Sequence, residues 1–171
     1  MSGSKKALMV IAFNNFRDEE LFDTKEELEK AGIETAVASI KTGTAKGMLG
    51  GTANAAIAIG DADSKDYDAV VFIGGGGASI YFNNKKAHEI ANSTYNSGKI
   101  LAAICIAPST LANAGLLKGK KATCFPSEAQ NLKSKGAIYT GKAVEIDGRI
   151  ITADGPESAH AFGKAIANAL K

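Results

Sequence analysis

Residues 99–108 read Lys-Ile-Leu-Ala-Ala-Ile-Cys-Ile-Ala-Pro, an apolar run long enough for one buried strand that ends at Cys105. Residues 109–114 favour a helix and follow almost at once. A cysteine at such a strand-to-helix turn stands at the carboxyl end of a sheet strand, where α/β folds place their chemistry. Because a helix amino end carries unpaired N–H groups, we expect the pKa of Cys105 to lie below the free value of about 8.5. A buried structural cysteine is the alternative, and the turn position favours the reactive thiol.

Strand-like and helix-like segments alternate on both sides of this run. The pattern predicts an α/β, flavodoxin-like sandwich: a mostly parallel sheet with helices on both faces, in a single domain over residues 1–171. The carboxyl third adds a hairpin at 144–151 around Asp147-Gly148, and a weaker hairpin is expected around Gly50-Gly51. The expected strands are 7–12, 33–40, 69–73 and 100–104, and the expected helices are 18–30, 85–97 and a last one that Pro156 opens and that runs to Leu170.

The composition is that of an ordinary globular protein, with 45% hydrophobic and 22% charged residues and a net charge of +2. The lysines are spread along the chain, which argues against a nucleic-acid partner. No apolar run approaches the ~20 residues of a membrane span, and residues 1–6 are too short and polar for a signal peptide. Two cysteines without a secretion signal predict free thiols in a reducing compartment, so we expect a cytoplasmic protein.

Four consecutive glycines, at 74–77, follow a predicted strand and raise the question of a nucleotide site. They do not fit one, since the third glycine of a dinucleotide fingerprint would fall at Ser79 and no Gly-Lys-Ser/Thr follows. The sequence therefore predicts no cofactor.

Two interpretations of the glycines remain open. They could form a tight turn that needs positive φ. Alternatively, the bare N–H groups of Gly75 or Gly76 could join that of Ile106 to bind an oxyanion beside Cys105.

The acids Asp18, Glu19 and Glu20 begin a predicted helix just after the first strand. For Asp18 and Glu19 we expect solvated acids that complement the helix dipole. One carboxylate of the three could still reach the Cys105 site, where a neutral carboxyl would donate a hydrogen bond to a thiolate or an oxidised sulfur.

Bases and metal ligands are scarce. His88 and His160 both fall within predicted helices and not at strand ends, so we expect neither to be catalytic. Cys124 is expected on a short buried strand, as an inert core thiol. The cysteines and histidines lack metal-ligand spacing, and the sequence predicts no zinc site.

Four segments carry a resemblance to a known family: residues 16–20 (Phe-Arg-Asp-Glu-Glu), Gly74-Gly75, residues 103–108 and Gly155-Pro156. Together they resemble the ThiJ/PfpI superfamily over about Lys6 to Leu170. That superfamily has the class I glutamine-amidotransferase-like, flavodoxin-like fold. It includes the parkinsonism-associated redox protein and the PfpI intracellular peptidases.

The resemblance implies that Cys105 is the nucleophile at the elbow and that Glu20 is the family glutamate, usually protonated, that hydrogen-bonds its sulfur. Gly75 and Ile106 would supply the oxyanion N–H groups. One departure matters. The peptidase-like branch carries histidine where this chain has Ile106, and the parkinsonism-associated branch carries histidine where this chain has Phe125. The missing base argues against peptidase activity.

The sequence thus predicts a cytoplasmic protein centred on an oxidisable Cys105, acting in redox or stress response. It leaves open whether the chain is an enzyme. A weak glyoxalase, deglycase or other cysteine-dependent hydrolase, acting on a small aldehyde or peptide, is one alternative, and a non-catalytic binding or chaperone-like module is another. By the resemblance, we expect a homodimer or a larger homo-oligomer.

Overall fold

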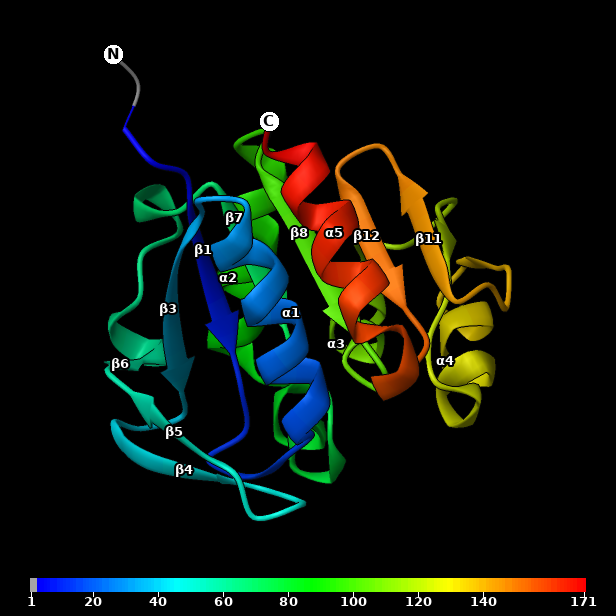
Figure 1. The fold of residues 1–171 in the computed structure, drawn as a ribbon. Coiled ribbons are helices and arrows are strands. Elements are labelled where there is room, and N and C mark those ends of the chain that lie inside the picture. The colour runs from blue at the N-terminus through cyan, green and yellow to red at the C-terminus, as the bar shows by residue number, and fades with distance from the viewer. Residues whose placement is uncertain (1–2) are drawn as a thin grey trace.

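The computed structural model describes residues 3–171, and its centre is a sheet of seven strands within that range. The strands lie in the order β11-β12-β8-β7-β1-β3-β6 (Figure 1). Neighbouring strands run parallel, except that β11 and β12 form an antiparallel hairpin at one edge. The strands span Lys6–Val10 (β1), Glu34–Ser39 (β3), Ile57–Ala58 (β6), Ala69–Phe72 (β7), Ile100–Ile104 (β8), Val144–Asp147 (β11) and Ile150–Ala153 (β12).

Helices cover both faces of this sheet, as Figure 1 shows. On one face α1 (Asp18–Lys30) and α5 (Ala159–Ala169) pack against each other, and on the other lie α2 (Lys85–Asn96), α3 (Pro108–Asn113) and α4 (Ala129–Ser134). Each face has its own apolar core. The three-layer α/β architecture expected from the sequence is confirmed. Short 3-10 helices connect these elements at Ile59–Asp61, Ser64–Asp66, Gly76–Tyr81, Pro126–Glu128 and Pro156–Ser158.

The central strands follow directly from their sequences. All residues of β7 and β8 are buried, and so is β1 after Lys6. A strand covered on both faces needs apolar side chains on both, so a continuous apolar run replaces the alternation of a half-exposed strand. The carboxyl ends of β1, β7 and β8 therefore lie side by side at one edge.

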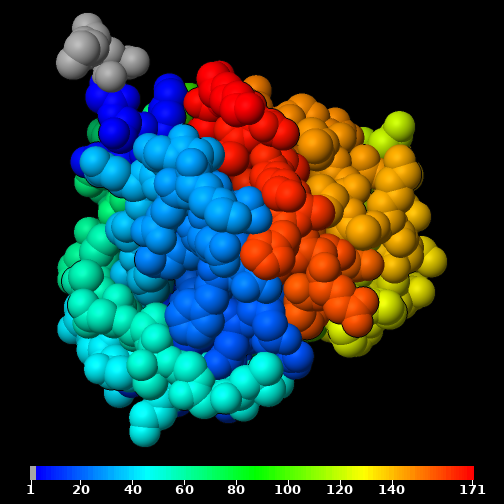
Figure 2. All heavy atoms as spheres, viewed as in Figure 1, coloured from blue at the N-terminus to red at the C-terminus, as the bar shows by residue number. Residues whose placement is uncertain are grey.

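Two small sheets complete the fold. One combines β2 (Asn14–Phe16) with the hairpin of β4 (Gly43–Gly47) and β5 (Thr52–Ala55), which confirms the weaker hairpin. Figure 2 shows this hairpin, in cyan, beside α1 on the surface. The other pairs β9 (Lys121–Ala122) with β10 (Ile138–Tyr139).

Two expectations about side chains are wrong. Cys124 is not on a strand, because β9 ends at Ala122, although the thiol is fully buried as expected. Asp18 is not a solvated acid: it is 7% exposed, and its two carboxylate oxygens accept the N–H groups of Leu49 and Gly51 at 2.8 and 2.7 Å. Asp18 thus fastens the tip of the β4–β5 hairpin to the first turn of α1.

None of the helices within residues 3–171 has the length and apolar character needed to cross a membrane.

Candidate functional site

The carboxyl end of β8 forms a strained turn at Cys105. Its φ of 65° lies in the left-handed region, which a residue with a side chain rarely adopts. The turn is held from two sides: the Cys105 N–H donates to the carbonyl of Ala153 at 2.9 Å, and its own carbonyl accepts the N–H of Phe125 at 2.8 Å. The sharp strand-to-helix elbow expected from the sequence is therefore present, with the side chain 8% exposed.

Glu20 reaches this elbow from the first turn of α1. Its side chain is fully buried, and Oε1 accepts the N–H of Gly74 at 2.9 Å. Oε2 has no hydrogen-bond partner within residues 3–171. Burial raises the pKa of Glu20 to about 7, against the smaller lowering effects of the neighbouring Cys105 side chain and of the Gly74 N–H.

Gly74 makes the contact between Glu20 and Cys105 sterically possible. A Cβ at this position would lie 2.5 Å from Glu20 Oε1, 2.6 Å from Cys105 Cβ and 2.8 Å from the Ile104 carbonyl oxygen. The sequence analysis missed this residue as a part of the site. Its signals were its place directly after a buried strand and its part in the Gly74-Gly75 pair that carried the family resemblance.

The expected lowering of the Cys105 pKa is wrong. Burial, followed by the charge of Glu20 and the hydrogen bond with it, raises the pKa of the thiol to about 12. The backbone N–H groups of Gly75 and Ile106 act in the opposite direction on this pKa, with a smaller effect. The helix that was expected to lower the pKa has six residues and begins only at Pro108, which has no N–H to offer.

The other predicted site residues fall into two groups. Gly75 and Ile106 lie with Glu20 around the Cys105 sulfur. The N–H of Gly76, in contrast, donates to Met48 Sδ at 3.3 Å, on the β4–β5 hairpin, so it is not directed at the elbow.

A cleft of about 380 Å³ lies next to the elbow. Cys105 does not line this cleft, but two residues that do are hydrogen-bonded to the site. The N–H of Phe125 donates to the carbonyl of Cys105, and the N–H of Arg17 donates to the carbonyl of Gly74. The Arg17 guanidinium makes a bidentate pair with Glu19, at 3.0 and 3.1 Å. The remaining lining residues are Pro126, Asp154, Gly155, Pro156 and Glu157.

Both histidines are engaged elsewhere. Nε2 of His88 lies 2.8 Å from the Phe82 carbonyl oxygen, and Nδ1 of His160 lies 2.9 Å from Glu27 Oε2. Glu20 is thus the titratable side chain in contact with the Cys105 sulfur within the described residues. The described residues that could hold a metal ion lie on α1 and α5: Asp23, Glu26 and His160.

A sequence model of the DJ-1/PfpI family matches residues 5–169. The chain belongs to the DJ-1/PfpI family. It is 44% identical to an uncharacterized protein of Methanocaldococcus jannaschii over 97% of this chain and 82% of the relative. It is 30% identical to a protein of Pyrococcus abyssi named a deglycase, over 96% of this chain and 99% of that one.

The fold agrees with this membership. The crystal structure of a ThiJ/PfpI domain protein from Brachyspira murdochii superposes with a TM-score of 0.95 at 33% identity, covering 98% of each chain. The family resemblance inferred from the sequence is therefore confirmed.

Proposed function

We propose that this chain acts through Cys105 as an oxidation-responsive thiol and that Glu20 is its proton partner. The observation that carries the proposal is a fully buried carboxyl, with its pKa raised to about 7, in contact with a cysteine in a strained turn. Perturbed titratable groups that meet at such an elbow are typical of functional sites, while a purely structural thiol needs no such partner.

Protonation of Glu20 changes the character of the thiol. The charge of Glu20 is one of the causes that raise the Cys105 pKa, and this effect disappears when the carboxyl is neutral. A neutral carboxyl also provides an O–H donor for the sulfur. With the N–H groups of Gly75 and Ile106, three donors would then stabilise a thiolate or an oxidised sulfur.

Oxidation at this site would take two balanced steps. The thiol reacts with one peroxide to form a sulfenic acid: an S–O bond forms, the O–O bond breaks, and the second oxygen leaves as water. A second peroxide adds a second oxygen and again yields water, giving the sulfinate. We propose that Glu20 donates to a sulfinate oxygen and that this hydrogen bond opposes further oxidation to sulfonate.

Intact-mass analysis after mild peroxide tests this proposal. We expect the mass of two added oxygens in the native chain and in Cys124→Ala, and none in Cys105→Ala. Glu20→Leu, which leaves no donor at this position, should progress to three oxygens more readily, while Glu145→Leu, the same change at another buried carboxyl, should behave as the native chain. If peptide mapping finds Cys124 modified first, or Cys105 unmodified in the folded protein, the proposal is wrong.

A weak glyoxalase or deglycase activity is the second candidate. It is supported by the 30% identity to a protein named a deglycase and by the cleft next to the elbow. A thiol adds to an aldehyde carbon, so that an S–C bond forms and the carbonyl oxygen gains a proton. We propose that Glu20, whose pKa of about 7 lies near working pH, supplies and recovers that proton. Isoleucine and phenylalanine at positions 106 and 125 offer no base for peptide cleavage.

We further propose that the protein works in the cytoplasm as a homodimer or larger homo-oligomer. Light scattering of the purified chain tests the assembly, and a monomeric mass at micromolar concentration would contradict it. A chain without turnover of any aldehyde and without oxidation at Cys105 would instead be a binding or chaperone-like module.

A further inference from the structure

We propose that His160, Asp23 and Glu26 form a binding site for a divalent transition ion of the Zn²⁺ class. The site would lie on the outer side of the α1–α5 pair and is independent of Cys105. One potential ligand atom from each of the three residues lies within 4.8 Å of the others. An imidazole nitrogen with two carboxylate oxygens is a donor set that suits zinc and its neighbours.

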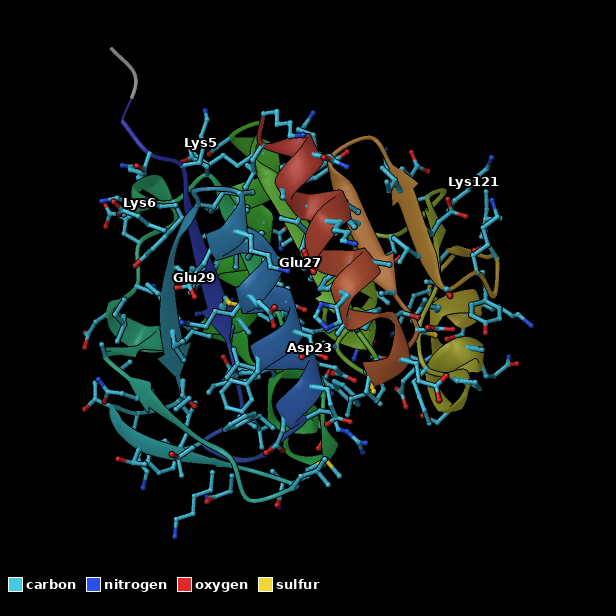
Figure 3. The ribbon with its side chains drawn as sticks, in the orientation of Figure 1. Lys5, Lys6, Asp23, Glu27, Glu29 and Lys121 are labelled. Atoms are coloured by element: carbon cyan, nitrogen blue, oxygen red, sulfur yellow. The ribbon has the colours of Figure 1, made fainter. Side chains whose placement is uncertain are left out.

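The two helices hold these residues close together. Asp23 and Glu26 are three residues apart on α1 and so share one face of that helix, and His160 comes from the first turn of α5. Gly163 permits the close approach, because a Cβ there would lie 2.8 Å from Glu27 Cβ and 3.0 Å from the Thr24 carbonyl oxygen. Figure 3 labels Asp23 and Glu27 on α1, on the side toward α5.

The orientation of the His160 ring points to a ligand. Its Nδ1 lies 2.9 Å from Oε2 of Glu27, a residue that is only 8% exposed. A histidine that binds a metal usually donates its other ring N–H to a carboxylate, which fixes the tautomer and leaves the second nitrogen as the ligand. Glu27 would be this positioning residue. In that tautomer Nε2 of His160 would face Asp23 with its lone pair.

The distance between His160 Nε2 and Asp23 Oδ2 fits two ligands of one metal ion better than it fits a hydrogen bond. Nε2 lies 3.5 Å from Asp23 Oδ2, which is too long for a good N–H···O bond. Two ligands of a tetrahedral zinc with bonds of about 2.1 Å lie about 3.4 Å apart. The exposed Glu26 side chain can close the remaining gap by rotation. Its pair with Lys30, at 3.4 Å, is also exposed, so breaking it costs little.

Titration calorimetry with Zn²⁺, on a full-length Cys105→Ala/Cys124→Ala chain, tests the proposal without interference from the thiols. We expect one ion per chain. His160→Ala and Asp23→Asn should abolish binding or weaken it more than 10-fold, and Glu27→Gln should weaken it about 10–100-fold. His88→Ala, a change of the histidine on α2, is the matched control and should bind as the parent does. Circular dichroism verifies that each variant folds.

Absorption of the Co²⁺-loaded chain separates coordination from a merely structural role. A tetrahedral site gives intense visible bands, which should be present in the parent and absent from His160→Ala. Glu27→Gln should shift these bands, because a neutral amide oxygen accepts the Nδ1–H of His160 more weakly than a carboxylate does. No Zn²⁺ binding below millimolar concentration, or binding that is unchanged in folded His160→Ala, would overturn the proposal.

Discussion

The two buried cysteines differ in what surrounds them and not in how deeply they lie. Burial raises the pKa of both thiols to about 12. Cys105 has a positive φ and lies beside two backbone N–H donors and the carboxyl of Glu20, whose pKa of about 7 is near neutral pH. Cys124 lies in the core on the opposite face of the sheet, near the negative charges of Glu128 and Asp154. A high thiol pKa alone therefore does not distinguish a functional cysteine from a structural one. A neighbouring carboxyl that can gain or lose a proton near neutral pH does.

The largest expected effect is on aldehyde consumption. Glu20→Gln keeps the shape of the side chain but cannot carry a proton to and from the substrate, so we expect a loss of ~10²–10⁴ in rate, the usual worth of acid–base assistance. The assay is the disappearance of a 2-oxoaldehyde, with Cys105→Ala as the blank. Glu145→Gln should retain full activity. Undiminished turnover in Glu20→Gln would show that Glu20 takes no part in the mechanism. The proton-carrying neighbour would then no longer distinguish Cys105 from Cys124.

The second effect is on stability against pH. The folded-state pKa of Glu20, about 7, lies above the usual value of 4.5, so the folded chain binds this proton more tightly than the unfolded one. The stabilisation of the folded state by this proton is therefore fully present below pH 4.5. It is lost as pH rises toward 7 and beyond, which lowers the free energy of unfolding by about 3 kcal/mol. Urea unfolding should show Glu20→Gln more stable than the native chain at pH 8 but not at pH 4. Equal curves for both chains at pH 8 would contradict the raised pKa.

The third effect concerns the steric fit at the elbow. Gly74→Ala places a Cβ against Glu20 and Cys105, and we expect a loss of ~1–3 kcal/mol in the free energy of unfolding, typical of overpacking. Gly60→Ala is the control, since nothing lies within 4 Å of its Cβ, and it should change stability by less than ~0.5 kcal/mol. Chemical denaturation of both variants compares them, and equal losses would show that Gly74 is not under steric constraint.

The smallest effect is expected at the second thiol. Cys124→Ala removes a buried sulfur and should cost ~1 kcal/mol of stability. Its peroxide products and aldehyde turnover should equal those of the native chain, because the two cysteines belong to cores on opposite faces of the sheet. A change in the oxidation of Cys105 in this variant would reveal a coupling across the sheet.

The sequence predicted the elements whose signals are local. Helix α1 spans the predicted residues 18–30, strand β8 spans 100–104, and the hairpin with Asp147-Gly148 forms where expected. Apolar runs, an acidic first turn and an Asp-Gly pair each act within a few residues, so they can be recognised without the fold.

The site depended on contacts that no local pattern records. The thiol pKa is set by burial and by Glu20, which is distant in the chain, and Asp18 is buried by a hairpin that follows it. The cluster of Asp23, Glu26 and His160 could not be found by spacing, since its members come from helices at opposite ends of the chain.

The way in which the elbow is held has a consequence for the chain during its synthesis. The Cys105 N–H finds its acceptor on Ala153, in a strand that the ribosome makes only later, while Glu20 and Gly74 emerge earlier. Before β12 pairs with β8, Cys105 lacks this acceptor and the apolar cover of Ile151 and Ala153, so we expect its pKa to lie closer to the free value of about 8.5. We therefore expect a nascent chain to react with electrophiles more readily than the mature protein, and alkylation of Cys105 in chains that end before and after β12 tests this.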